Sequence, residues 1–299
     1  MNTILIADSI GQSGIEFLKG KGLDVVYKPD ITPAELLSEI KNYDALIVRS
    51  RTKVTGAVIA AGKQLKVIGR AGSGLDTIDV ATAKKTGITV VNAPGANSQS
   101  VAEHTMAFIL ALFRNLIPVA NALKNGKWEK KTYKAAELAG KTIGIVGFGN
   151  IGGKVAGMAA GFGMKVLVTT RSATPGGANV PLETLLSESD VVTLHVPKSE
   201  QTTAMIAAKE LGLMKKTAFL VNCSRGGVVD EGALVEALQH HRIAGAALDV
   251  FPVEPLPQDS PLLSLSNVLL TPHVAAASAE SRERASLAVA REVARALGS

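Results

Sequence analysis

Residues 141–171 read KTIGIVGFGNIGGKVAGMAAGFGMKVLVTTR, and this stretch decides the fold. An apolar run at 142–146 leads into a glycine-rich segment at 147–152, after which apolar residues recur at helical spacing. A second apolar run, 165–169, has the β-branched character of a strand. The stretch therefore predicts a strand, a glycine turn, a helix and a second strand, which together make one βαβ unit of about thirty residues.

The glycine pattern G-x-G-x-x-G has meaning here because it lies between a strand and a helix. Gly147 would allow the tight turn, Gly149 would let the backbone approach a pyrophosphate, and Gly152 would let the helix pack closely on the strand. The first N–H groups of the helix would then point at the phosphates. We predict a dinucleotide site, with another adenosine-containing cofactor as the alternative. The predicted contacts of this turn are Gly147, Phe148, Gly149, Asn150, Ile151 and Gly152.

The composition is that of a globular protein with more than one core. A length of 299 residues is near the limit for a single core, and 46% of them are hydrophobic. No apolar run approaches the roughly 18 residues of a membrane span, and the first ten residues do not resemble a signal peptide. The single cysteine, Cys223, excludes an internal disulfide. We therefore expect a cytoplasmic protein that is not bound to a membrane.

The net charge of +6 is spread along the chain and favours small anionic ligands. Aromatic residues make up only 4% of the sequence, so nucleic acid is not expected as a partner.

Residues 1–98 alternate short apolar runs with helical segments, which predicts a parallel sheet covered by helices. The expected strands are 4–7, 25–27, 45–48, 67–68 and 89–91, and helices are expected to begin near residues 14, 33, 55 and 77. Basic residues and glycines follow two of these strands, at the sheet edge where open α/β sheets bind ligands. The alternative is a solvated basic loop and a flexible turn. The predicted substrate contacts are Arg49, Ser50, Arg70, Ala71, Gly72 and Ser73.

A long helix after residue 95 is expected to lead into a second domain. Ser100 and Glu103 have the spacing of a capping box, and Pro118 would break the helix beyond residue 113. The six strands expected beyond it, at 142–146, 165–169, 191–194, 218–222, 244–248 and 268–270, are the number in a full dinucleotide fold. The final helix, 279–297, is free to return to the first domain. We predict an α/β protein with a Rossmann dinucleotide-binding domain (99–279) inserted in a flavodoxin-like parallel-sheet substrate domain (1–98 and 280–299).

Three residues that could carry redox chemistry follow consecutive strands of the second domain. Arg225 could bind a carboxylate with its planar fork of donors, whereas His273 could transfer a proton near neutral pH. Glu254 would favour the imidazolium form of a nearby histidine. Each residue alone could be an ordinary turn or surface residue. Because they share one sheet edge, we predict that Arg225, Glu254 and His273 are catalytic.

The other histidines and the cysteine are interpreted differently. His104 is expected to be structural, His195 to lie near the adenine, and His240 and His241 to lie on the surface at a helix end. Cys223 could act as a nucleophile with His273 as its base, but no oxyanion-turn signature surrounds it. No metal site is predicted. The remaining predicted cofactor contacts are Thr170, Arg171, Ser172, His195, Val196, Pro197, Thr202, Cys223, Ser224 and Asp249.

The end of the second strand of the βαβ unit predicts the cofactor. An NAD-selective fold places an acid about twenty residues into the unit, where it binds the ribose hydroxyls. Here the segment reads Thr170-Arg171-Ser172, which offers donors for a 2′-phosphate and no carboxylate. We therefore expect NADP as the cofactor, with NAD possible. The alternative is that Arg171 points into solvent and the protein does not discriminate.

Several motifs in order resemble the D-isomer-specific 2-hydroxyacid dehydrogenases, in particular short phosphoglycerate dehydrogenases. They are LIVRS at 46–50, GRAG at 69–72, AEHT at 102–105, GKW at 126–128, the βαβ unit, CSRG at 223–226, DVF at 249–251 and TPH at 271–273. The resemblance implies that Arg225 orients the substrate, that Glu254 pairs with His273, and that His273 passes the proton. It also implies a homodimer formed largely through the inserted domain. The C-terminal regulatory extension of longer members is not seen, so serine feedback through it is not expected.

The function expected on these grounds is NAD(P)-dependent interconversion of a D-2-hydroxy acid and its 2-oxo acid by hydride transfer. Phosphoglycerate oxidation competes with reduction of glyoxylate or hydroxypyruvate, because pocket size cannot be judged from the sequence. An alternative of another class is a dinucleotide-sensing interaction protein, since some relatives of this fold act as corepressors.

Overall fold

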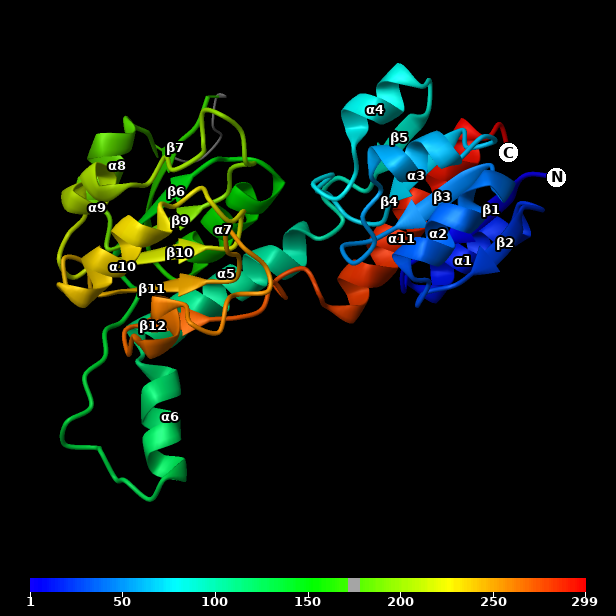
Figure 1. Ribbon diagram of the computed structural model, residues 1–299. Coiled ribbons are helices and arrows are strands. Elements are labelled where there is room, and N and C mark those ends of the chain that lie inside the picture. Colours follow the sequence, from blue (N-terminus) through cyan, green and yellow to red (C-terminus); the bar gives the residue numbers. More distant parts are fainter. Residues whose placement is uncertain (172–177) are drawn as a thin grey trace. The chain divides into compact units, whose positions relative to one another are not determined.

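The computed structural model describes residues 1–171 and 178–299, which form two compact units (Figure 1). Unit 1 consists of Met1–Asn97 and Ala276–Ser299, and unit 2 consists of Ser98–Ala275. The chain therefore enters unit 2 at residue 98 and returns to unit 1 for its last helix. This is an inserted arrangement of the kind expected from the sequence.

Unit 1 is built on a five-stranded parallel sheet with strand order β2-β1-β3-β4-β5. Its strands are β1 (Thr3–Ile6), β2 (Asp24–Tyr27), β3 (Ala45–Val48), β4 (Val67–Arg70) and β5 (Thr89–Asn92). Its helices are α1 (Gln12–Gly20), α2 (Pro33–Glu39), the 3₁₀ turn η1 (Ile40–Asn42), α3 (Gly56–Ala61), α4 (Val80–Lys85) and α11 (Ala279–Ala296). All four residues of β3 are buried, because helices cover both faces of the sheet.

The C-terminal helix α11 belongs to unit 1 because it packs closely on the sheet and on α1. A Cβ on Gly69 of β4 would lie only 2.6 Å from Cγ2 of Val293, so a glycine in the strand lets the helix approach. Glu283 accepts hydrogen bonds from the backbone N–H groups of Gln12 (3.2 Å) and Ser13 (3.1 Å) at the start of α1. The first and last helices are thereby joined.

Unit 2 contains a seven-stranded parallel sheet with strand order β12-β11-β10-β9-β6-β7-β8. Its strands are β6 (Thr142–Val146), β7 (Lys165–Thr169), β8 (Ala178–Asn179), β9 (Val191–Leu194), β10 (Phe219–Asn222), β11 (Gly245–Leu248) and β12 (Val268–Leu270). Its shorter helices are α7 (Asn150–Gly161), α8 (Leu182–Glu188), α9 (Ala208–Leu213), α10 (Glu231–Gln239) and the 3₁₀ turn η2 (Pro261–Ser264). All six predicted strands are present. The two-residue β8 was not predicted, because it is too short to show a periodic pattern.

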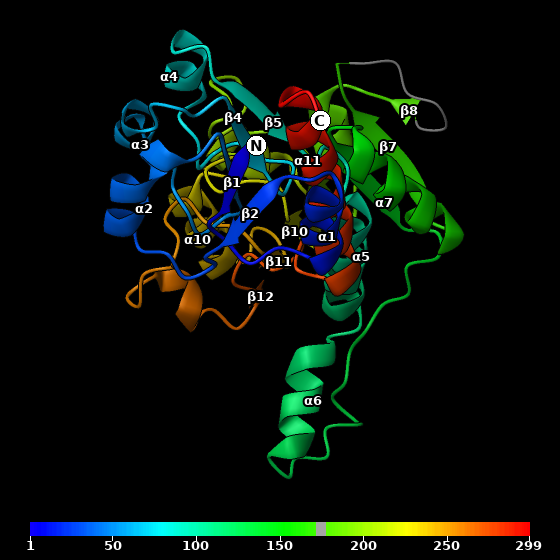
Figure 2. The same cartoon turned by 90° about the vertical axis from the view of Figure 1, so that its right-hand side faces the viewer.

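The long helix at the start of unit 2 ends at residue 113, as expected, but Pro118 is not the residue that ends it. It divides into α5 (Ser98–Phe113) and α6 (Leu116–Lys124), which are bent by 66° around the left-handed residue Asn115. Pro118 lies inside α6 and does not end the first helix. No residue of α6 is buried, and the helix extends away from the rest of unit 2 (Figure 2). Among the described helices none alone is long and apolar enough to span a membrane, although α5 and α6 satisfy that test as a bent pair.

Candidate active site

The glycine turn joins β6 to α7 at the carboxyl edge of the unit 2 sheet. Gly147 has φ 94°, and a Cβ there would lie 2.5 Å from the carbonyl oxygen of His195. A Cβ on Gly152 would lie 2.2 Å from the carbonyl oxygen of Gly147, so the third glycine brings helix and strand together. A Cβ on Gly149, which caps α7, would meet no described atom within 4 Å, so the space beside this glycine is open to a ligand. These properties fit a pyrophosphate at the N-terminus of α7.

The residues after β7 lie where the adenosine ribose is expected. Asn179 of β8 holds the backbone of Thr170, because its Oδ1 accepts from the Thr170 N–H at 3.4 Å and its Nδ2 donates to the Thr170 carbonyl at 3.5 Å. Arg171 is exposed. Ser172, the third predicted contact at this strand end, lies outside the described residues.

The loop after β9 is fixed by its own hydroxyl groups. Thr202 accepts a hydrogen bond from the Ser199 N–H at 2.8 Å and donates one to the carbonyl of Pro197 at 2.6 Å. The Nε2 atom of His195 lies 3.1 Å from Oγ1 of Thr193, whereas its Nδ1 is buried with no partner in the described part of the chain. Burial lowers the pKa of His195 to about 4, so this ring is neutral at physiological pH.

Asn222 organises the turn after β10. Its Oδ1 accepts from the backbone N–H (3.0 Å) and the hydroxyl (2.7 Å) of Ser224, and its Nδ2 donates to the carbonyl of Arg225 at 3.1 Å. Nη1 of Arg225 in turn donates to the Ser224 carbonyl at 2.8 Å. A Cβ on Gly226 would lie 1.8 Å from the carbonyl oxygen of Phe251, so a glycine is needed for this turn to contact the loop after β11.

Cys223 lies in the same turn but is not an activated nucleophile. Its thiol is buried, and burial raises the pKa of Cys223 to about 12. A cysteine nucleophile reacts as the thiolate. The alternative of a cysteine–histidine centre therefore loses its support.

His273 and Glu254 form a close pair at the same sheet edge. Nδ1 of His273 lies 2.7 Å from Oε2 of Glu254, and Oε1 of Glu254 accepts from the Phe251 N–H at 3.0 Å. Both side chains are more than a third exposed. A cavity of about 510 Å³ lies beside the pair. Its lining is otherwise mostly apolar and comprises Phe251, Pro255, Leu256, Leu263, Leu270, Thr271 and Pro272.

Asp249 fixes the turn that carries His273. Its carboxylate is fully buried and accepts from the hydroxyl of Thr271 at 2.5 Å and from the backbone N–H groups of Val274 and Ala275, both at 2.8 Å. All these donors belong to the protein. The predicted contact of Asp249 with a cofactor stays a prediction, whereas its role in holding this turn was missed.

In unit 1, Arg49 follows β3. Its backbone N–H donates to the buried carboxylate of Asp8, and its Nη1 lies 3.3 Å from the carbonyl of Ser9. Burial, followed by the positive charge of Arg282, lowers the pKa of Arg49, and Asp8 opposes this shift. The positive charge of Arg282 therefore acts on Arg49, and a bound anion would relieve this repulsion.

Arg51, two residues later, has a structural role. Its Nε lies 3.1 Å from Oδ1 of Asp8, and its remaining donors contact the carbonyls of Ala7, Pro29 and Ile31. Arg49 is therefore the better candidate for a ligand of the two arginines in this loop.

The second predicted substrate loop follows β4. Nη1 of Arg70 donates to the carbonyl of Ala71 at 3.1 Å, and a Cβ on Gly72 would lie 2.7 Å from that same Nη1. Ser73 donates to Oδ1 of Asn97 at 2.8 Å. The glycine therefore makes room for the guanidinium of Arg70 in the loop, while Ser50, in the loop after β3, is exposed.

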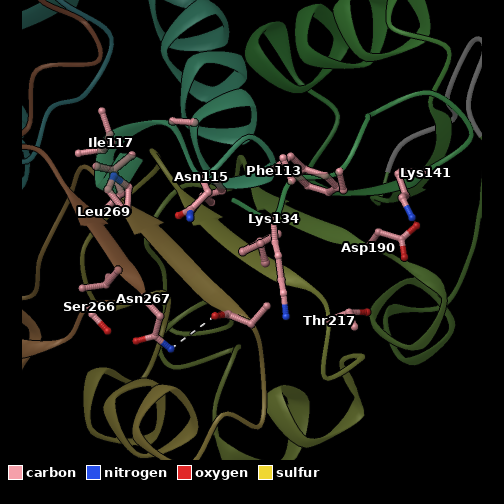
Figure 3. Close-up of a pocket in the computed structure, with 18 of the residues that line it drawn as sticks. Phe113, Asn115, Ile117, Lys134, Lys141, Asp190, Thr217, Ser266, Asn267 and Leu269 are labelled. Atoms are coloured by element: carbon pink, nitrogen blue, oxygen red, sulfur yellow. Dashed lines mark hydrogen bonds between the residues drawn. The ribbon is translucent and has the colours of Figure 1, made fainter. Parts of the chain in front are cut away.

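A larger cavity, of about 920 Å³, lies at the amino ends of the unit 2 strands (Figure 3). It is bordered by the junction of α5 and α6, including Asn115 and Ile117, and by residues that precede or begin strands, such as Asp190, Thr217 and Asn267. The glycine turn, Arg225 and His273 all lie at the carboxyl ends. This cavity is therefore not the candidate active site.

The sheet order, the glycine turn and the histidine–glutamate pair define an α/β protein of the dinucleotide-binding class. The family described as D-isomer specific 2-hydroxyacid dehydrogenase, NAD binding domain, matches residues 106–275. The chain belongs to this family, as expected from its motifs.

Individual relatives agree with this assignment. The chain is 44% identical to a D-3-phosphoglycerate dehydrogenase of Synechocystis, over 98% of this chain and 54% of that protein, and 43% identical to a hydroxypyruvate reductase of Thermotoga maritima, over 98% and 97%. The crystal structure of the TT0316 protein from Thermus thermophilus matches with a TM-score of 0.92 and 35% identity, over 99% of this chain and 97% of that one. The chain spans about half the length of the phosphoglycerate dehydrogenases it matches.

Proposed function

We propose that the protein interconverts a D-2-hydroxy acid and its 2-oxo acid by hydride transfer with a nicotinamide dinucleotide. The observation that carries the proposal is the 2.7 Å pair of His273 and Glu254, which lies at the sheet edge that also holds the glycine turn. A nicotinamide dinucleotide supplies the hydride acceptor for oxidation and the hydride donor for reduction.

His273 is assigned to proton transfer in this reaction. Because the carboxylate of Glu254 can only accept, the ring proton lies on Nδ1, and Nε2 of the neutral ring can take the proton of the substrate hydroxyl. As C2 loses its hydride, the C–O bond becomes a carbonyl and the hydroxyl proton passes to Nε2. Glu254 stabilises the imidazolium that results. In reduction, the imidazolium returns the proton to the oxygen.

Arg225 is assigned to binding the substrate carboxylate. Asn222 donates a hydrogen bond to the carbonyl of Arg225, and the guanidinium of Arg225 donates to the carbonyl of Ser224, so the position of this side chain is defined. A planar guanidinium binds a carboxylate through two parallel hydrogen bonds, and it would also polarise the adjacent carbonyl of a 2-oxo acid.

A role in substrate binding is also proposed for Arg49 of unit 1. Arg49 is partly buried beside the like charge of Arg282, which supports an anionic ligand there. A phosphate would fit, and we place phosphoglycerate ahead of glyoxylate or hydroxypyruvate on this ground.

The proposed cofactor is NADP, with NAD as the alternative. The end of β7 carries Thr170 and Arg171, with no acid to repel a 2′-phosphate, and Asn179 fixes the backbone of Thr170. The guanidinium of Arg171 is exposed and could donate to that phosphate.

We also propose a homodimer in which the second copy covers α6. Leu116 and Leu123 of α6 are 52% and 56% exposed, and Ile117 and Pro118 of the same helix line the cavity of about 920 Å³. Exposed apolar side chains gathered on one helix are typical of an interface. In analytical ultracentrifugation, the double variant Leu116→Ser/Leu123→Ser should sediment as a monomer at concentrations where the wild type is dimeric. Leu37→Ser, which replaces an exposed leucine of unit 1, is the control; a monomeric wild type would refute the proposal.

The activity is tested by assaying a panel of 2-oxo acids with NADH and with NADPH. We expect saturable oxidation of a reduced cofactor with at least one 2-oxo acid and loss of this activity in His273→Gln. Reduced-cofactor binding in the absence of turnover with every acid would instead favour the dinucleotide-sensing interaction protein. The proposed location of this activity is a reducing cytoplasm, in keeping with one buried thiol.

A further inference from the structure

We propose that His104 and Ser100 of α5 are positioning residues that hold the turn carrying His273 in its reactive geometry. The inference rests on the role of His273 given above, and it adds a second element, remote in sequence, to the machinery of the proposed reaction. His104 was expected to be merely structural.

The turn requires support because its backbone is strained. His273 has φ 53°, a left-handed conformation that a residue with a side chain seldom adopts. Such a conformation persists only where the surroundings over-determine it, and it clusters at functional sites. The N–H of His273 donates a hydrogen bond to the carbonyl of Thr271 at 3.0 Å, which is one internal hydrogen bond that stabilises the turn.

The first external support comes from the end of β11. The carboxylate of Asp249 accepts the N–H groups of Val274 and Ala275, which directly follow His273, and the hydroxyl of Thr271, which lies two residues before it. Asp249 therefore holds the chain on both sides of the strained residue His273.

The second support comes from α5. Oγ of Ser100 donates to the carbonyl of Ala275 at 2.6 Å, and both residues are buried. One helical turn further on, Nε2 of His104 lies 3.2 Å from Oγ1 of Thr271 and 3.8 Å from Oδ1 of Asp249. Residues four apart share one face of a helix, so one face of α5 forms hydrogen bonds with both ends of the 271–275 turn.

The direction of these hydrogen bonds follows from proton counting. Thr271 has one hydroxyl proton, and it must be donated to Asp249 because a carboxylate only accepts. Oγ1 of Thr271 can therefore only accept from His104, which places a proton on Nε2 of His104. A chain of hydrogen bonds therefore connects His104 through Thr271 to Asp249, which also accepts from the backbone that follows His273.

The side chain of His104 is not part of the buried apolar face of α5. Its side chain is 23% exposed, whereas the apolar residues Ala102, Met106 and Ile109 of α5 are buried. The rings of His104 and Phe108 form an edge-to-face pair, with centroids 4.5 Å apart. Replacing the ring should therefore change the hydrogen bond to Thr271 more than the packing of α5.

The decisive comparison is between His104→Leu, which cannot donate, and His104→Gln, whose amide nitrogen can reach the place of Nε2. A displacement of about 1 Å at a reacting group costs roughly 100-fold in rate. We expect His104→Leu to lower kcat about 10- to 100-fold while leaving the Kd for the reduced cofactor, measured by fluorescence titration, within about twofold. His104→Gln should recover most of the lost kcat. Glu103→Gln, on the exposed side of the same helix turn, is the control.

Ser100→Ala provides an independent variant should His104→Leu fold poorly, and it should lower kcat in the same way. The inference is overturned if His104→Leu and Ser100→Ala keep wild-type kcat, or if kcat, cofactor affinity and Tm fall together without rescue by glutamine. If His273→Gln also retains activity, the proposed function itself is wrong. Loss of activity in His273→Gln with normal activity in the α5 variants would refute only the positioning role.

Discussion

Nδ1 of His273 lies 2.7 Å from Oε2 of Glu254, and the second oxygen of that carboxylate is held at 3.0 Å by the N–H of Phe251. The side chain of Glu254 is therefore oriented by a hydrogen bond within its own loop as well as by the histidine. This arrangement sets the orientation and the tautomer of the imidazole, and it leaves Nε2 available for the proposed proton transfer.

The first prediction concerns His273. His273→Gln should lower kcat about 100- to 10,000-fold, the usual contribution of a general acid–base group. The Kd for the reduced cofactor should stay nearly unchanged, because the glycine turn is intact. Stopped-flow and fluorescence titration measure the two quantities, with the surface variant His240→Gln as control. A His273→Gln enzyme that keeps more than about a tenth of wild-type kcat would exclude the assignment.

The second prediction concerns Glu254. Glu254→Gln removes the carboxylate that accepts from Nδ1 of His273 at 2.7 Å, and the amide in its place can also donate, so the ring is held less well. The kcat for oxidation should therefore fall, as measured by steady-state kinetics. Glu236→Gln, which breaks an exposed pair with Arg242 (2.8 Å), should leave kcat unchanged. A wild-type kcat in Glu254→Gln would count against the pairing.

The third prediction concerns the substrate. If the substrate carries a phosphate, Arg49→Ala should raise KM for the phosphorylated acid much more than for glyoxylate, because only the former loses an ionic contact. Steady-state kinetics with both acids tests this, and Lys53→Ala, an exposed cation in the same loop, is the control. Equal effects on the two acids would favour the glyoxylate or hydroxypyruvate activity.

The fourth prediction concerns the cofactor. Arg171→Ala should weaken NADPH roughly 10- to 150-fold, which corresponds to one charge-assisted contact, and should spare NADH. Thr170→Asp should remove the preference by repelling the 2′-phosphate. Lys165→Ala, at the opposite end of β7, is the matched control. A wild type with a higher kcat/KM for NADH would show that the strand end has been assigned wrongly.

The fifth prediction concerns Cys223. With the pKa raised to about 12, roughly one thiol in ten thousand is ionised at pH 8. Iodoacetamide should therefore leave the native protein unlabelled and fully active, whereas the protein in urea should be labelled once. Mass spectrometry and residual turnover provide the measurements. Rapid labelling of the native protein with parallel loss of turnover would restore the cysteine hypothesis.

Local sequence signals predicted most elements because they act over a few residues. Strand periodicity located β6, β7 and β9, and the glycine pattern located the turn after β6. The same local reasoning misread Ser100 and Glu103 as a capping box. In the structure the hydroxyl of Ser100 donates to Ala275, and Glu103 accepts from Gln99.

The sequence by itself determined the two α/β units, the glycine turn and the histidine, glutamate and arginine at consecutive strand ends, because spacing and residue type express these features directly. Only the tertiary structure decided which groups support them. Asp249 meets Ala275 across 26 residues, and His104 meets Thr271 across 167. These contacts depend on how strands and helices pack, and no local pattern records them. The same holds for the different roles of Arg51, which is bound to Asp8, and Arg49, whose pKa is lowered by burial and by the charge of Arg282.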